Sequence, residues 1–372
     1  MPGSDDFEPD PDVVKYHRLF RWLFLVILLV GCGFLAFCCW LVFSVLQKTE
    51  LIQNRKGGGP VHVVILAVED FGNVGRHLAG ALEVAGHTAC LIRERPHPFD
   101  YDNGHRQAPG RVLPQSDTRA VQHELCAADV LIWKDDRPPC DLPGNWLPDV
   151  PSICTAEGNG FRRNWAMFAQ AARGAGASAI VPLTPDLFFP AICRPWIPQP
   201  YRFSGPAWIG PPAVPLLFHA VGNNRECKGT DSVWQPALQL LAERGQRFRF
   251  DLVSGRPWRQ VRTRRLWSSV VFDQADERIG AWGMNAVECM ADGVPVVCYL
   301  SAEAREAAGD KLDGCPLVLL PEPDPVCLAD AVQQLLQSDL RQYSADVFRW
   351  ARGVHGYEAV GRQWSDLLRG IV

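Results

Sequence analysis

The sequence predicts an α/β fold made of two Rossmann-like, doubly wound domains that follow an N-terminal apolar segment. Short apolar runs alternate with helical stretches along most of the chain, which is typical of parallel sheets covered by helices. In two places such a run leads into a glycine-containing loop and then a helix. A chain of 372 residues is also long enough for two domains of ordinary size, expected at 61–200 and 201–345.

The composition narrows the class of protein. Hydrophobic residues make up 47% and charged residues 21%, as in a globular chain, and the net charge of -4 gives no reason to expect a nucleic-acid partner. The 13 cysteines are scattered without a C-x-x-C pair, which argues against a zinc ribbon and a disulfide framework. We interpret them as reduced thiols that pack like small apolar side chains.

The N-terminal part predicts a membrane anchor. Residues 1–18 form an acidic tail that we expect to be disordered, and residues 19–46 are almost wholly apolar, beyond the roughly 20 residues that span a bilayer. A cleaved signal peptide fits less well because the run is too long, and a buried core helix would need a polar face. Residues 47–60 are a polar, glycine-rich linker.

The first domain opens with a buried strand, 61–67, followed by a glycine loop and a helix over 77–85. Gly72 and Gly75 lie in this loop, but a complete dinucleotide fingerprint is absent, which argues against an NAD enzyme. The further expected strands are 88–92, 130–133, 152–155 and 179–182, with helices at 120–127 and 161–172.

The second domain carries cations on a loop between an expected strand, 214–218, and a helix through Leu241. Thr230 or Asp231 offers an N-cap for this helix. Arg225 and Lys228 could clamp a diphosphate, or could be solvated loop charges.

A second loop-to-helix segment runs from Phe272 to Val297. The glycines before the helix allow a ligand to approach the backbone, and free N–H groups at a helix start attract anions. Glu288 in the helix body could accept hydrogen bonds from sugar hydroxyls, or could be an exposed helix residue. Taken together, the two segments favour a nucleoside-diphosphate site.

The order of these residues resembles the donor half of GT-B glycosyltransferases. The matching pattern is Asn224-Arg225-x-x-Lys228-Gly229-Thr230-Asp231, then Asp273-Gln274, then Gly-x-Trp-Gly-x-x-x-x-Glu-x-Met-Ala-x-Gly-x-Pro-Val-Val. It is most similar to the retaining group called group 1 or family 4. The resemblance is strongest over 218–297 and continues more weakly back to about residue 63 and on to the C-terminus.

Together with the apolar segment 19–46, which predicts the membrane anchor, the resemblance implies a retaining transferase that moves a sugar, typically a hexose, from a nucleotide-sugar donor to a glycan or lipid-linked acceptor, as in polysaccharide biosynthesis. The resemblance also implies that no metal and no other cofactor is needed. It further implies that the chain crosses between the two domains at 196–201 and that residues 346–372 pass back over the first domain. The catalytic residues would be Arg225, Lys228 and Glu288, the donor-binding residues Asn224, Asp273, Gln274, Gly280, Trp282, Gly283 and Met284, and the acceptor-cleft residues Gly72, Gly75, Glu157 and Asn159.

Two departures from the family keep other functions open. Gly280 stands where many members have the first of two glutamates, and the family's histidine is missing after Thr155. A catalytically inactive binding or scaffold protein is therefore an alternative, as is a sugar-nucleotide epimerase. The loop of Glu157 could likewise be a plain strand-to-helix turn.

The orientation of the anchor rests on chemistry. Cations flank the apolar segment equally on both sides, so the positive-inside rule gives no answer, and Gly31 and Gly33 even allow a re-entrant hairpin. Nucleotide sugars are made in the cytosol, and the scattered thiols suit a reducing compartment. We expect the catalytic part in the cytoplasm; a lumenal domain in a secretory compartment is the alternative.

Overall fold

The computed structural model describes residues 59–96, 99, 111–134, 146, 148–189, 193–222 and 225–372, nearly all of them in the compact unit Pro60–Val372. The predicted tail (1–18) and anchor (19–46) lie outside these residues, as does most of the linker, so they stay predictions. Within the described part of the chain, no helix is both long and apolar enough to cross a membrane.

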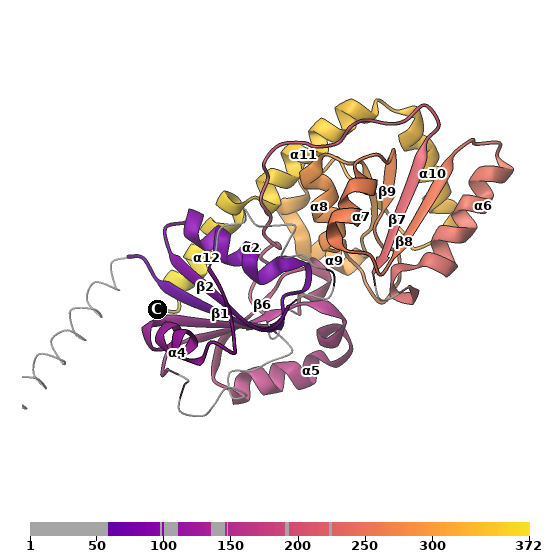
Figure 1. Ribbon diagram of the computed structural model, residues 1–372. Coiled ribbons are helices and arrows are strands. Elements are labelled where there is room, and N and C mark those ends of the chain that lie inside the picture. Colours follow the sequence, from indigo (N-terminus) through magenta and orange to yellow (C-terminus); the bar gives the residue numbers. More distant parts are fainter. Residues whose placement is uncertain are drawn as a thin grey trace, which may run out of the picture. The chain divides into compact units, whose positions relative to one another are not determined.

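The first domain is built on a parallel sheet of six strands in the order β3-β2-β1-β4-β5-β6. The strand order reverses between β1 and β4, so the predicted doubly wound sheet is confirmed. Strands β1, β2 and β6 are labelled in Figure 1. The sequence reading missed β3, an edge strand of four residues with no buried side chain. The strands are β1 (His62–Glu69), β2 (Thr88–Arg95), β3 (Arg111–Pro114), β4 (Val130–Lys134), β5 (Ser152–Ala156) and β6 (Ala177–Pro182).

Helices cover both faces of this sheet because its strands carry apolar side chains on both sides. Ile65 and Leu78 belong to the cluster on one face, and Leu66, Leu125 and Phe161 to the cluster on the other. The helices are α2 (Val74–Val84), α4 (Thr118–Ala127) and α5 (Gly158–Gly174).

The second domain has a parallel sheet of five strands in the order β11-β10-β9-β7-β8 (Figure 1). Its strands are β7 (Leu216–Gly222), β8 (Arg249–Ser254), β9 (Val270–Phe272), β10 (Val296–Tyr299) and β11 (Val318–Leu320). Its helices are α6 (Gln235–Glu243), α7 (Trp258–Arg265), α8 (Met284–Asp292), α9 (Ala302–Ala308) and α10 (Pro325–Gln337).

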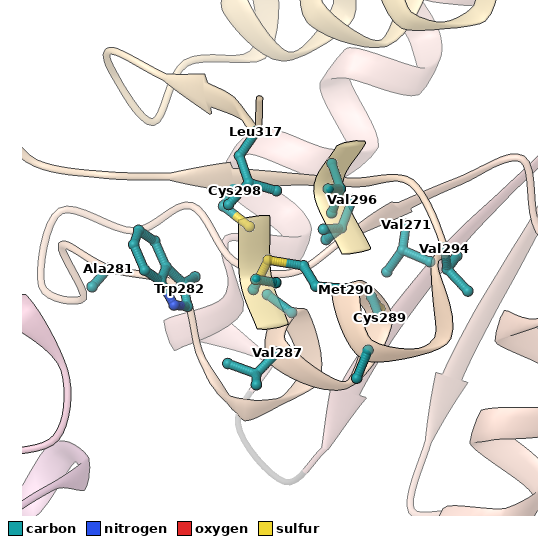
Figure 2. Packing of buried hydrophobic residues seen from close by; sticks show 14 of the residues in the cluster. Val271, Ala281, Trp282, Val287, Cys289, Met290, Val294, Val296, Cys298 and Leu317 are labelled. Atoms are coloured by element: carbon teal, nitrogen blue, oxygen red, sulfur yellow. The ribbon is translucent and has the colours of Figure 1, made fainter. Parts of the chain in front are cut away.

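Helix α8 is deeply buried beside the predicted site. Seven of its nine residues are buried, and Val287 and Met290 pack on Val296 and Cys298 of β10 (Figure 2). Gly293 ends the helix with a left-handed backbone, as its position predicts. A side chain that starts from this helix is therefore held on a rigid support.

The chain crosses between the two domains twice, and the two crossings touch. The first crossing leads through Trp196–Tyr201. The second joins α11 (Leu340–His355) to α12 (Tyr357–Arg369). The Tyr201 N–H donates to the His355 carbonyl at 2.8 Å. The His355 Nδ1–H donates to the Gln199 carbonyl, also at 2.8 Å.

Helix α12 completes the core of the first domain. Val360, Trp364 and Leu368 are fully buried in the same cluster as Ile65 and Leu78. The contact with α2 is close: a Cβ at Gly361 would lie 2.4 Å from the Ala81 carbonyl oxygen. Helix α11 packs on α8 of the second domain, so α12 is the helix that packs on the first domain.

Candidate functional site

Two adjoining pockets, of about 300 and 540 Å³, lie where loops that follow β1, β5 and β7 meet α8. Glu157 and Lys228 line both pockets. These loops follow the carboxyl ends of parallel strands, where α/β proteins bind ligands. The first pocket is lined by Phe71, Val253, Trp258, Met284 and Glu288 among others, and the second by Lys134, Thr184, Gln274 and Gly283 among others.

Lys228 is placed in the pockets by a turn that requires glycine. Gly229 has a φ of +64°, and a Cβ there would lie 2.0 Å from the Ala275 carbonyl oxygen. The Lys228 ammonium donates to the Gln274 side-chain oxygen at 2.7 Å and lies 3.4 Å from an oxygen of Asp273. Its side chain keeps 21% of its surface exposed, so the charge is fixed in position but open to a ligand.

Asp273 connects this lysine to the start of α8. Its side chain is fully buried, and it accepts the Gly283 N–H at 2.7 Å and the Asn285 side-chain amide at 3.2 Å. Gln274 in turn donates to the Ala281 carbonyl. The structure thus brings Lys228, Asp273, Gln274 and Gly283 together, with Asp273 and Gln274 holding the other groups in place.

Arg225 does not join this group. Its guanidinium binds the exposed carboxylate of Asp231, with N–O distances down to 2.5 Å, and it lines neither pocket. Of the two cations expected to form a clamp, the structure places Lys228 in these two pockets and Arg225 outside them. Asn224 lies outside the described residues.

The predicted N-cap at Thr230 or Asp231 is also wrong. The chain makes a π-helical turn, Thr230–Trp234, before α6, and neither side chain caps it. The Thr230 hydroxyl instead donates to His219 Nε2 at 2.9 Å, because His219 uses its Nδ1–H on the Phe272 carbonyl, also at 2.9 Å. His219 thereby ties the Lys228 loop to β9.

Burial lowers the pKa of His219 to about 4, and likewise that of His355. We expect acid to destabilise the protein through these two groups. Both are neutral in the folded state above that pH, whereas an unfolded histidine binds a proton near 6.5. The stabilisation is complete above about pH 6.5 and is lost as the pH falls towards 4, by about 3 kcal/mol for each histidine.

Denaturant unfolding at about pH 7 and about pH 4 measures this loss, and His219→Gln isolates one contribution. Between about pH 7 and about pH 4, the free energy of unfolding should fall by about 3 kcal/mol less in the variant than in the wild type. Equal losses in both proteins would show that His219 does not stay neutral in the folded state.

Glu288 is neither solvated nor unpaired. Its side chain is 2% exposed; one oxygen accepts the Trp258 indole N–H at 3.0 Å and the other accepts Arg265 at 2.7 Å. Arg265, with no exposed side-chain surface, also binds Asp292 at 3.0 Å. Burial raises the pKa of Glu288, while the charge and hydrogen bond of Arg265 oppose that rise. Glu288 still lines the first pocket, so the network holds its carboxylate against a ligand site.

The sequence reading missed Trp258, Arg265 and Lys134. The only signal for Arg265 was the arginine-rich composition of α7, which by itself indicates a solvated helix face. For Lys134 the signal was its position: a lysine as the last residue of a buried strand lies at the ligand-binding edge of a parallel sheet.

Gly72 and Met284, two of the remaining predicted residues, line the first pocket. Gly72 has a φ of +62°, and its Cβ position lies 2.9 Å from the Met284 side chain, so the loop after β1 touches the start of α8. Gly75 lies inside α2 and lines neither pocket; its N–H binds Asp70. Asn159 belongs to α5, and its side chain lies outside the described atoms.

Trp282 and Gly280, which were expected to contact the donor, are buried outside these two pockets. The Trp282 indole is 1% exposed and meets Trp196 and Trp350 edge-on, with ring centroids 6.1 Å apart in both pairs. A Cβ at Gly280 would lie 2.6 Å from the Ser301 hydroxyl oxygen, so an acid there would require the Ser301 side chain to move. Neither residue lines a pocket.

In the described part of the chain, no cluster of three or more histidine, cysteine, aspartate or glutamate side chains could hold a metal ion. The same part has nine cysteines, all free thiols. Burial raises the pKa of Cys289 and of Cys298, which pack in the core as apolar side chains.

Comparison with known proteins identifies the fold. No model of a protein family matches the chain, and no curated protein matches it. Anabaena Alr3699/HepE in complex with UDP and glucose is 11% identical, with a TM-score of 0.58 over 83% of this chain and 100% of that one. A glycosyltransferase from Rickettsia africae is 11% identical, with a TM-score of 0.54 over 84% and 98%.

A Thermobaculum terrenum O-GlcNAc transferase is 14% identical, with a TM-score of 0.52 over 84% of this chain and 68% of that one. These structural neighbours share the two-domain GT-B architecture, and the chain has the same fold.

Proposed function

We propose that the protein is a glycosyltransferase that moves a sugar from a nucleotide-sugar donor to a hydroxyl of a glycan or lipid-linked acceptor. One observation carries the proposal. Lys228 lines two adjoining pockets, the segment that starts α8 contributes to both, and the buried carboxylate of Glu288 lines the first of them. This is a site for an anion beside a site for hydroxyl groups, on a fold whose neighbour from Anabaena binds UDP and glucose.

The two pockets suggest where each part of the donor lies. The first pocket has largely apolar walls and two carboxylates, Glu157 and Glu288, which suits a base and its ribose. The Gly283 N–H before α8 is held by Asp273, but Lys228 and the first N–H groups of the helix, at Met284 and Asn285, lie where a diphosphate would follow, because such N–H groups lack carbonyl partners in the helix. The larger second pocket would hold the sugar and the acceptor.

In the reaction, the bond between the anomeric carbon and the phosphate oxygen breaks, and its electron pair stays on the diphosphate. Lys228 stabilises this charge, and the acceptor oxygen forms the new bond while its proton is released. Retention of the anomeric configuration is implied by the family resemblance alone. The anomeric coupling constant in the proton NMR spectrum of the product tests it.

The test of the proposal is turnover of nucleotide sugars by the full chain in detergent. We expect one or more of the UDP-, GDP- or dTDP-sugars to bind and to release the nucleotide faster when a sugar acceptor is added. No binding of any of them would refute the proposal.

A binding or scaffold protein without catalysis is the second candidate. It is favoured by the absence of an acid at position 280 and of a histidine after Thr155. Donor binding without nucleotide release would support this candidate, whereas recovery of an isomerised donor sugar would indicate an epimerase.

We further propose that residues 19–46 anchor the enzyme in a membrane, with the described domains in the cytoplasm. The apolar length of the segment and the cytosolic source of nucleotide sugars support this. Labelling with a membrane-impermeant thiol reagent in intact cells tests it, using the exposed Cys126. Labelling of the large domain without lysis would refute the cytoplasmic location.

We expect Glu288→Gln to weaken binding of the donor nucleotide by roughly 10- to 100-fold, the usual cost of losing a hydrogen bond to a charged group. Glutamine cannot accept from both Trp258 and Arg265 and still offer an oxygen to a ribose hydroxyl. Isothermal titration calorimetry with UDP is the measurement.

The matched control is Asp292→Asn. Asp292 belongs to the same ionic network through Arg265 but does not line either pocket. Its substitution should reduce stability and leave UDP affinity within about twofold. An equal loss of affinity in both variants would show that Glu288 acts through the fold and not by contact.

A further inference from the structure

Arg256 is a second cation in the wall of the first pocket, besides Lys228. It is an exposed residue, and it lines the first pocket but not the second. Gly255, with a φ of +61°, turns the chain after β8, and Pro257 is the residue before α7. The arginine is thus held in a short turn between a strand and a helix.

The arginine differs from its neighbours on α7 in having no protein partner. Arg262 pairs with Asp292 at 2.6 Å. Arg264 pairs with Asp251 at 3.0 Å. Among the described residues, no hydrogen bond or ion pair engages the Arg256 guanidinium. Its N–H groups are therefore available to a ligand in the first pocket.

The order of the strands places Arg256 at the end of the site that lies away from the second pocket. Strands β9, β7 and β8 are neighbours in that order. Gln274 follows β9 and lines only the second pocket, Lys228 follows β7 and lines both, and Arg256 follows β8 and lines only the first. The Ser254 hydroxyl donates to the Gly222 carbonyl at 3.1 Å and ties the ends of β8 and β7 together. A ligand with its diphosphate at Lys228 would thus have its base on the side of Arg256.

Apolar side chains surround this end of the first pocket. Val253, Trp258 and Val261 line the first pocket and not the second. An apolar pocket with a few polar groups that fix the orientation of the ligand suits a nucleobase. Glu288 lines the same pocket, and its oxygens can only accept, which suits the ribose hydroxyl groups.

We propose that Arg256 selects the base of the nucleotide sugar, and that it favours the oxo bases uracil, thymine and guanine over the amino bases cytosine and adenine. The inference rests on the proposed function and names the class of its sugar-donor substrate. A guanidinium only donates hydrogen bonds, so it requires an acceptor on the base. Uracil and thymine offer O4, and guanine offers O6 with N7 beside it. Cytosine and adenine carry an amino group at the corresponding position, which would set one N–H against another.

Isothermal titration calorimetry on the full chain in detergent tests this selection. The probes are three pairs of nucleoside diphosphates, namely UDP with CDP, dTDP with dCDP, and GDP with ADP. Within each pair the sugar and the diphosphate are the same. In the pair that binds most tightly, we expect the oxo member to bind at least about tenfold more tightly than the amino member, as for one good guanidinium–base contact.

Two variants separate a contact with the base from a general effect of charge. Arg256→Gln should weaken the oxo member about tenfold and bring the amino member to within about threefold of it, because a glutamine amide can turn to donate or to accept. The matched control is Arg249→Gln. It removes the same charge from the exposed first residue of β8, which lines neither pocket, and it should change neither affinity.

An amino member that binds the wild type as tightly as its oxo partner would overturn the inference. So would an Arg256→Gln variant whose affinities are unchanged, or one that binds both members more weakly in an unchanged ratio, since the latter would place Arg256 on the diphosphate. Failure of all six nucleotides to bind the wild-type chain would count against the proposed function itself.

Discussion

Replacing Lys228 by alanine is expected to lower the rate of sugar transfer by about 10²- to 10³-fold, as for the loss of one preorganised group that stabilises transition-state charge. Lys228 is the cation at the shared wall of the two pockets, and Gln274 and Asp273 already hold it in place. Its charge therefore needs no reorganisation when the diphosphate leaves. The measurement is kcat at saturating donor, with the melting temperature as a check on folding.

Arg225→Ala is the matched control. This arginine lies three positions away on the same loop, but its guanidinium binds Asp231 at the surface and lines neither pocket. Transfer should stay within about threefold of the wild type, as for a surface ion pair of small energy. If Arg225→Ala were as damaging as Lys228→Ala, the two-cation clamp expected from the sequence would be restored.

Replacing Arg265 by methionine is expected to destabilise the protein by about 3–5 kcal/mol, the cost of removing one partner from a buried ionic network. Arg265 has no exposed side-chain surface, and it neutralises Glu288 and Asp292, both almost fully buried. Methionine fills much of the volume but leaves these carboxylates with less compensation. Denaturant unfolding of the two proteins at neutral pH measures the difference.

The adjacent residue supplies the control. Arg264 is exposed and pairs with Asp251 at the surface, so Arg264→Met should change the free energy of unfolding by no more than about 0.5 kcal/mol. Similar effects at both positions would mean that the loss comes from α7 as a helix and not from the buried network.

Sequence periodicity predicted most strands of the first sheet because buried parallel strands are continuous apolar runs. It did not predict β3, β8 or β9, since β3 and β8 are largely exposed and β9 has only three residues. It also placed Glu288 on a helix after a glycine loop, a local pattern with local causes. Sequence periodicity could not predict the partner of Glu288. Arg265 lies 23 residues away on another helix, and only the packing of α7 against α8 brings the two side chains to 2.7 Å.

The same limit explains the loop of Arg225 and Lys228. Sequence order shows two cations near each other, but the short 3-10 turn Glu226–Lys228 separates them, so that one reaches the pocket and the other binds Asp231. Gly280 shows the converse. Glycine fits at position 280 because the Ser301 hydroxyl oxygen would be 2.6 Å from a Cβ there. Ser301 lies 21 residues further along the chain, so no local sequence pattern predicts this contact.

The return of α12 to the first domain has a consequence for the order in which the protein is made. The ribosome releases the first domain first, yet Val360, Trp364 and Leu368 of its core arrive only with the last helix, Tyr357–Arg369. The second domain has all of its strands long before that. The domain synthesised first is thus finished last, and a chain that stops before residue 357 would expose Leu78 and Leu82 to water even though its second sheet is complete.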